Sequence, residues 1–142
     1  MDREVIEEKL ESLRRCVGRV REKRPATPEA FLRDFDLQDI VTLNLTRAVQ
    51  LCVDVGAHLI SGSEFPPPDS MSETFDAMVQ AEVLDRKLAD RLKKAVGFRN
   101  IAVHNYRSID WSVVHSICRD RLGDFDDFAR AVVSHMEKTD RK

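Results

Sequence analysis

Apolar side chains recur every three to four positions along most of this chain, the spacing that gathers them on one face of an α-helix. The strict alternation typical of a half-buried β-strand does not occur in the sequence. We therefore expect an all-α protein. The pattern predicts helices over residues 2–24, near Phe31, over residues 36–61, from Ser70 to Val79, from Asp85 through Gly97 into residues 98–106, and from Asp110 to Met136.

Local signals predict where several of these helices begin and end. Pro25 should end the first helix, because a proline cannot continue one. Thr27, with a proline directly after it, is predicted to cap the next, short helix. Ser70 and Glu73 form a capping-box pattern, which predicts a new helix start there. Residues 61–69, which include three consecutive prolines, are predicted to be a loop.

The composition indicates one globular domain over residues 1–142, with the last few residues expected to be disordered. Hydrophobic residues make up 42% of the chain, which is typical of a chain with a packed core. A net charge of −2 gives no general attraction to nucleic acid, so RNA binding would require a local basic patch. No secretory signal and no membrane-spanning apolar run is predicted, so we expect a cytoplasmic protein. The cysteines expected to be buried and reduced are Cys16, Cys52 and Cys118.

One stretch, residues 98–106, concentrates side chains that can do chemistry. On an ideal helix Tyr106 falls about 20° from Arg99, on the same face, whereas His104 falls about 140° away. Arg99 and His104 would therefore meet only if the helix frays after Val103 or if a second chain completes the site. The opposite face, expected to dock on the core, carries Phe98, Ile101, Ala102 and Asn105.

An arginine close to a histidine suits the cleavage of a phosphodiester. The guanidinium of Arg99 can hold two phosphate oxygens and stabilise the charge that develops on them. His104 belongs to the residue type that titrates near neutral pH, so it can accept the proton of a ribose 2′-hydroxyl or donate one to the leaving 5′-oxygen. Such a reaction leaves a cyclic phosphate and uses no metal. The four histidines lie too far apart in the sequence to indicate a metal site.

These residues resemble a known family. Arg99-x4-His104-x-Tyr106, with Asn100 directly after the arginine, is similar to the R-x4-H-x-Y motif of the HepT-like HEPN ribonucleases. The similarity covers roughly residues 2–137. Two further stretches that resemble the family are Asn44-Leu45-x-Arg47-Ala48 and Tyr106-x3-Asp110.

The resemblance implies an up-and-down helical bundle of HEPN type that forms a homodimer, with two motifs facing each other across a two-fold cleft. It implies a metal-independent RNA endonuclease without a cofactor, the toxin of a type VII-like HEPN/MNT toxin–antitoxin pair. Arg99 and His104 would then be catalytic, and Asn100 would support them. A cognate MNT nucleotidyltransferase antitoxin would neutralise the toxin by adding AMP to the hydroxyl of Tyr106, where the anionic group would repel an RNA phosphate.

Simpler interpretations stay open beside this one. The chain could be a non-catalytic helical module that serves a nucleotidyltransferase as a scaffold or substrate-binding subunit. Tyr106 could lie at the edge of the cleft, with its ring packed against the protein and its hydroxyl hydrated. Asn44 is expected to have a structural role, and His115 and His135 to pack or to lie on a helix surface. The basic residues from Arg14 to Arg24 are expected to be solvated, as are the acidic residues Asp124, Asp126 and Asp127.

Overall fold

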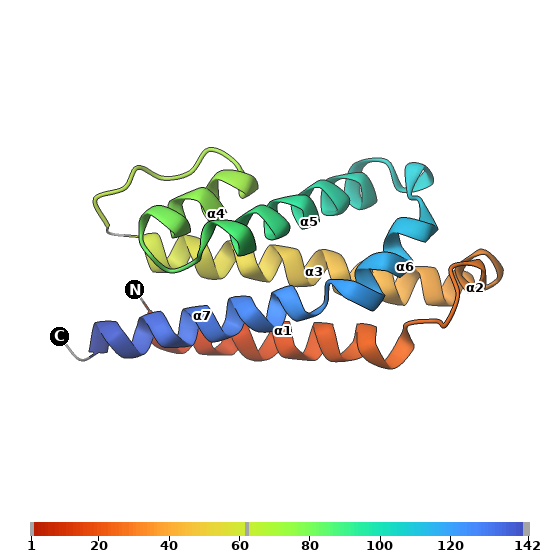
Figure 1. The fold of residues 1–142 in the computed structure, drawn as a ribbon, viewed down its shortest axis with the longest axis horizontal. Helices are drawn as coiled ribbons and strands as arrows, with labels where there is room; N and C mark the ends of the chain where they lie inside the picture. Colours follow the sequence, from red (N-terminus) through yellow and green to blue (C-terminus); the bar gives the residue numbers. More distant parts are fainter. Residues whose placement is uncertain (1, 62, 141–142) are drawn as a thin grey trace.

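The computed structural model describes residues 2–61 and 63–140, which contain seven α-helices and one short 3-10 helix joined by turns and loops (Figure 1). This confirms the prediction of an all-α fold. The elements are α1 (Arg3–Lys23), α2 (Glu29–Arg33), α3 (Phe35–Ile60), α4 (Met71–Gln80), α5 (Arg86–His104), η1 (Tyr106–Ser108), α6 (Trp111–Asp120) and α7 (Gly123–Asp140).

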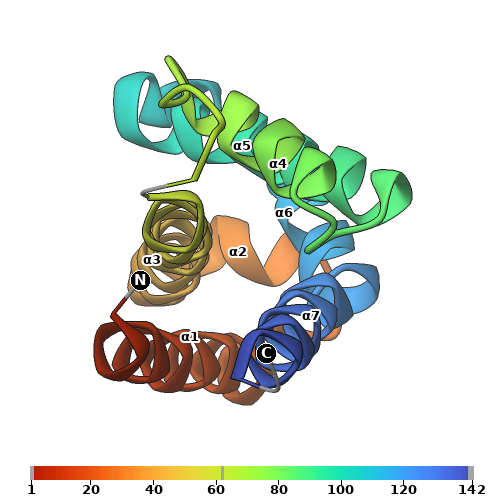
Figure 2. The same cartoon turned by 90° about the vertical axis from the view of Figure 1, so that its left-hand side faces the viewer.

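The long helices α1, α3, α5 and α7 run alternately up and down the bundle (Figure 1). Viewed from the end, α3 lies between α1 on one side and the pair α4 and α5 on the other, and α7 packs against both α1 and α5 (Figure 2). Phe31, Phe75 and Phe128 are fully buried in the core, and their burial contributes much of the apolar area removed from water. The start of α1 and the end of α7 lie at one end of the bundle, and α2, η1 and the start of α6 at the other.

The predicted helix starts are partly confirmed. The hydroxyl of Ser70 accepts a hydrogen bond from the Glu73 N–H at 3.2 Å, as the capping box predicts. The Glu73 carboxylate reaches one residue further back than expected and accepts from the Asp69 N–H at 2.8 Å. The prediction that Thr27 caps α2 was wrong, because α2 begins after Pro28 without a side-chain cap.

The predicted last helix is two helices. α6 ends at Asp120, a turn follows at Arg121 and Leu122, and α7 begins at Gly123. Leu122 is buried in this turn, and the glycine that follows it is a poor helix former, which favours a break in the helix at this point. As a result α6 leaves the direction of α7 and crosses toward α2 (Figure 1).

Two predictions about the chain ends and the membrane also change. α7 continues to Asp140, so the expected disorder of the last few residues does not begin before it, and residues 141–142 lie outside the described part. α3 is long and apolar enough to span a membrane by length and composition, contrary to the prediction. However, 50% of that segment is buried inside the fold, as expected of a core helix.

The three cysteines are free and buried, as predicted. Burial raises the pKa of the Cys118 thiol to about 11 and raises that of Cys52 well above its ordinary value. A thiol with a raised pKa carries little thiolate at neutral pH, so these side chains act as small apolar core residues.

Candidate functional site

Helix α5 carries the Arg99–His104 motif and keeps its helical conformation through His104. Asn105 then leaves the helix with φ −150°, while its N–H still donates to the carbonyl of Ile101 at 2.8 Å. The helix therefore does not fray after Val103. Of the two ways in which Arg99 and His104 were predicted to meet, only completion by a second chain is compatible with this geometry.

Within one chain, Arg99 and His104 remain apart. The Nη1 of Arg99 donates to the Oδ1 of Asn100 at 3.2 Å, so Asn100 holds the guanidinium from the adjacent position. The His104 side chain is exposed and takes part in no hydrogen bond or ion pair with the described chain. An exposed imidazole without a protein partner is available to exchange protons with a ligand.

Tyr106 does not continue the helix, so its predicted position on an Arg99 face was wrong. It begins the 3-10 helix η1, and its hydroxyl donates a hydrogen bond to the Oδ1 of Asp39 on α3 at 3.1 Å. Partial burial and this bond to a carboxylate both raise the pKa of Tyr106. The side chain is 38% exposed, so part of it is accessible to solvent.

Aromatic contacts fix the turn that follows α5. The ring of Tyr106 meets that of Trp111 edge-on, with centroids 6.0 Å apart, as the interpretation of a packed ring predicts. Trp111 in turn stacks on the buried Phe31 of α2 with centroids 5.2 Å apart. Sequence reasoning missed both Asp39 and Trp111, because only the folded chain brings α2 and α3 next to residues 106–111.

Exposed apolar residues lie on α3 one helical turn to either side of Asp39, the partner of the Tyr106 hydroxyl. Phe35, Asp39 and Leu43 follow one another at intervals of four residues, so they form one stripe on α3. Phe35 is 75% exposed, and Val103 on α5 is 51% exposed. Exposed apolar residues that gather in one place indicate a surface for association rather than a solvated face.

The expected core-facing side of the motif is only partly buried. Ala102 is buried and Phe98 packs against the core, as predicted. Ile101 is 45% exposed, and Asn105 lies beyond the helix end in solvent, so the prediction was wrong for these two residues. Ile101 is exposed because α5 and α6 diverge and leave a groove between them.

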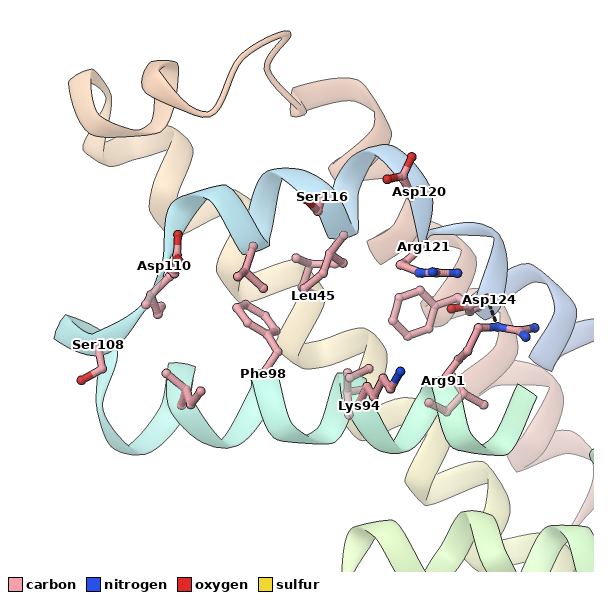
Figure 3. A pocket seen from close by; sticks show the side chains of 18 residues that line it. Leu45, Arg91, Lys94, Phe98, Ser108, Asp110, Ser116, Asp120, Arg121 and Asp124 are labelled. Atoms are coloured by element: carbon pink, nitrogen blue, oxygen red, sulfur yellow. Dashed lines mark hydrogen bonds and ion pairs between the residues drawn. The ribbon is translucent and has the colours of Figure 1, made fainter. Parts of the chain in front are cut away.

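This groove between α5 and α6 has a volume of about 450 Å³ (Figure 3). Its floor is apolar and includes Leu45 of α3 and Phe98 of α5 (Figure 3). The charges around it balance, with three cationic and three acidic side chains, and the pair Arg91–Asp124 joins two of them at 2.8 Å. The six charged residues are Arg91, Lys94, Arg121, Asp110, Asp120 and Asp124.

The acidic residues predicted to be solvated all form ion pairs, and Asp126 and Asp127 stay partly exposed while Asp124 is largely buried. Besides Asp124, which pairs with Arg91, Asp126 pairs with Arg21 of α1 and Asp127 with Arg130. Within the described residues, no group of three or more His, Cys, Asp or Glu side chains could hold a metal ion.

The other polar residues singled out in the sequence have structural positions. His115 is buried, with Nε2 3.1 Å from the carbonyl oxygen of Ala26, so its predicted packing role is confirmed. The buried Asn44 donates through Nδ2 to the carbonyl of Ile40 at 2.8 Å, one helical turn earlier, which fits its predicted structural role.

Residues 6–132 match the family described as Ribonuclease HepT-like. The chain belongs to this family. It is 34% identical over 125 residues to the mRNA nuclease HepT of Shewanella oneidensis, which covers 88% of this chain and 93% of that protein. A tRNA nuclease HepT from Aphanizomenon flos-aquae is 24% identical, over 93% of this chain and 90% of that protein.

A solved structure of a HepT-like relative has the same fold. It is the tri-AMPylated Shewanella oneidensis HEPN toxin in complex with an MNT antitoxin, with a TM-score of 0.85 and 32% identity over 94% of this chain and 99% of that chain. The cytosolic protein YutE of Bacillus subtilis, of unknown function, shares the fold at 20% identity with a TM-score of 0.81, over 97% of this chain and 92% of that chain. The HEPN-type helical bundle inferred from the motif is thereby confirmed.

Proposed function

We propose that this HepT-like protein is a cytoplasmic, metal-independent RNA endonuclease and the toxin of a HEPN/MNT pair. The observation that carries the proposal is the end of α5, which presents an exposed, unpartnered His104 and an Arg99 oriented by Asn100. The names of the relatives support this, since two of them are RNA nucleases and one solved relative is a HEPN toxin in complex with an MNT antitoxin.

The reaction proceeds within the RNA backbone. His104 accepts the proton of a ribose 2′-hydroxyl, and the 2′-oxygen attacks the neighbouring phosphorus. The bond from phosphorus to the 5′-oxygen breaks, and that oxygen leaves with the proton that His104 has taken up. Arg99 binds the non-bridging oxygens and stabilises the charge that develops on them. The products are a 2′,3′-cyclic phosphate and a 5′-hydroxyl.

The active form is a homodimer in which Arg99 of one chain and His104 of its partner act on the same phosphate. α5 stays helical through His104, so the two side chains point about 140° apart in one chain. The exposed apolar side chains Phe35 and Leu43 on α3 and Val103 on α5 supply a surface for the partner. A two-fold axis beside this surface would bring the two motifs face to face.

Tyr106 is the regulatory site of this scheme, and the MNT antitoxin adds AMP to its hydroxyl. The solved HEPN relative is AMPylated, which supports the assignment. Here the hydroxyl donates to Asp39, so transfer requires it to leave this carboxylate and lose its proton to a base of the antitoxin. Its oxygen then attacks the α-phosphorus of ATP, and pyrophosphate leaves. The added phosphate carries negative charge at the end of α5, two residues after His104, so it repels an RNA phosphate that approaches the motif.

RNA cleavage with matched histidine variants tests the proposal. His104→Ala should lower the cleavage rate at least ~100-fold, in the range of a lost general acid–base. His58→Ala, near the end of α3 remote from the motif, should cleave like the wild type. Cleavage should persist in EDTA and leave cyclic phosphate ends. The proposal fails if His104→Ala matches His58→Ala, or if chelation abolishes cleavage and magnesium restores it.

A further inference from the structure

A second groove, between α1 and α3, differs in charge from the one between α5 and α6. It encloses about 680 Å³, and Arg15 and Arg19 of α1 face Arg47 of α3 across it. Asp54 is the acidic residue among the described residues that line it, and this carboxylate already accepts a hydrogen bond from Gln50 at 2.9 Å. The groove is therefore a local cationic surface on a chain whose net charge is −2.

Most of the basic residues from Arg14 to Arg24 are exposed, as expected, and four of them also contact other groups of the chain. Arg14 pairs with Glu11 and Arg19 with Glu22, each at 3.2 Å. Arg21 pairs with Asp126, and Arg24 donates to the carbonyl of Cys118 at 3.0 Å. The guanidinium groups of these arginines therefore already have partners within the chain.

Arg15 and Arg47 differ from these residues. Neither side chain forms a hydrogen bond or ion pair with the rest of the described chain. Both guanidinium groups act on the same buried thiol: burial raises the pKa of Cys16, and the charges of Arg47 and Arg15 oppose that rise. Two free cations from different helices therefore face one spot, where they repel each other unless an anion binds between them.

The groove adjoins the proposed catalytic surface. Asp39, Leu43 and Arg47 lie at successive intervals of four residues on α3, and Asp39 holds the Tyr106 hydroxyl. Arg47 is thus about 12 Å along the helix from Asp39, at a rise of about 1.5 Å per residue. A strand bound at the motif could reach it with a neighbouring nucleotide.

We propose that Arg15 and Arg47 bind backbone phosphates of the RNA that flank the phosphate being cut. This inference rests on the proposed ribonuclease function and adds a second contact region to it. Phosphodiester oxygens suit the planar fork of arginine, and contacts to phosphates fix the register of a strand without reading its bases. The balanced charges of the α5–α6 groove give a phosphate no comparable attraction (Figure 3).

The test uses single-stranded RNA and the His104→Ala protein, which should bind without cutting. Fluorescence anisotropy at several salt concentrations gives the dissociation constant and its salt dependence. Combining Arg15→Ala with Arg47→Ala should weaken RNA binding at least ~10-fold. It should also make the plot of the logarithm of the association constant against the logarithm of the salt concentration less steep by about 1.4, at about 0.7 per lost phosphate contact. Replacing both arginines by lysine keeps the two positive charges and should restore most of the slope. That result would show that the loss in the alanine variants does not come from a folding defect.

The matched control removes the same charge elsewhere, through Arg14→Ala and Arg130→Ala together, two exposed arginines that pair with neighbouring acids. Equal loss of binding in the control and groove variants would overturn the inference. It would also be overturned if the groove variants bind RNA normally but lose either self-association or neutralisation by the antitoxin, which would make the groove a protein-docking face. If the wild type neither binds nor cuts RNA, the proposed function fails as well.

Discussion

Tyr106 and Asp39 lie 67 residues apart in the chain, and the phenol hydroxyl donates a hydrogen bond of 3.1 Å to the carboxylate. The bond joins the turn after α5 to the exposed stripe on α3. It also fixes the position of the single tyrosine of the chain, the proposed acceptor of AMP, beside the end of the motif helix. The fold therefore holds the proposed acceptor atom in place in the unmodified protein.

The first prediction concerns the acidity of this phenol. Asp39→Asn should lower the pKa of Tyr106 toward its ordinary value, because the negative charge that opposes ionisation is gone while the burial remains. Since the chain has one tyrosine, phenolate absorbance in an alkaline titration reports this pKa directly. Asp36→Asn, an exposed neighbour in the first turn of α3, is the control and should leave the titration unchanged.

The same bond has a defined effect on stability. A raised pKa in the folded state means that the contribution of Tyr106 to stability is fully present below the unfolded pKa of about 10. It is lost as the pH rises through the higher folded pKa. The wild type should therefore lose stability over this alkaline range more steeply than Asp39→Asn, as measured by denaturant unfolding. Parallel pH profiles for the two proteins would contradict the assignment.

Tyr106→Phe separates regulation from cleavage. The variant keeps the ring that packs on Trp111 but lacks the oxygen that would accept AMP. It should cut RNA at close to the wild-type rate and escape neutralisation by the antitoxin and ATP. Intact-mass spectrometry should show AMP additions on the wild type and none on the variant. If the variant gains the same mass, the acceptor is another residue.

The helices and the motif could be predicted from the sequence, because both depend on short-range patterns. These patterns are the helical period of the apolar residues and the spacing of Arg99, His104 and Tyr106. Capping patterns such as Ser70 with Glu73 are equally local. The end of α5 and the break between α6 and α7 were not predictable in this way. They depend on contacts between distant segments, including the stack of Trp111 on Phe31 and the bond from Tyr106 to Asp39. Ideal-helix geometry consequently misplaced Tyr106 while placing Arg99 and His104 on one regular helix.

A glycine at the crossing of α3 and α4 allows a prediction about stability. A Cβ at Gly56 would lie 2.7 Å from the Cγ2 of Thr74 and 2.8 Å from the Sδ of Met78. Gly56→Ala should therefore destabilise the fold by about 1–3 kcal/mol through overpacking. Gly18→Ala in α1, where nothing lies within 4 Å, should instead stabilise it by roughly 0.5–1 kcal/mol. Thermal unfolding gives both values, and a shift of the same sign in both variants would contradict this packing.

The most direct test of the shared ribonuclease site mixes two inactive variants. Arg99→Ala and His104→Ala should each be inactive alone. When they are mixed under conditions that exchange subunits, half of the dimers combine one chain of each, and each such dimer has one intact site made of Arg99 from one chain and His104 from the other. RNA cleavage should therefore return to about a quarter of the wild-type rate at equal protein concentration. A mixture that exchanges subunits but stays inactive would contradict the shared site, and a wild type that cuts no RNA would contradict the ribonuclease itself.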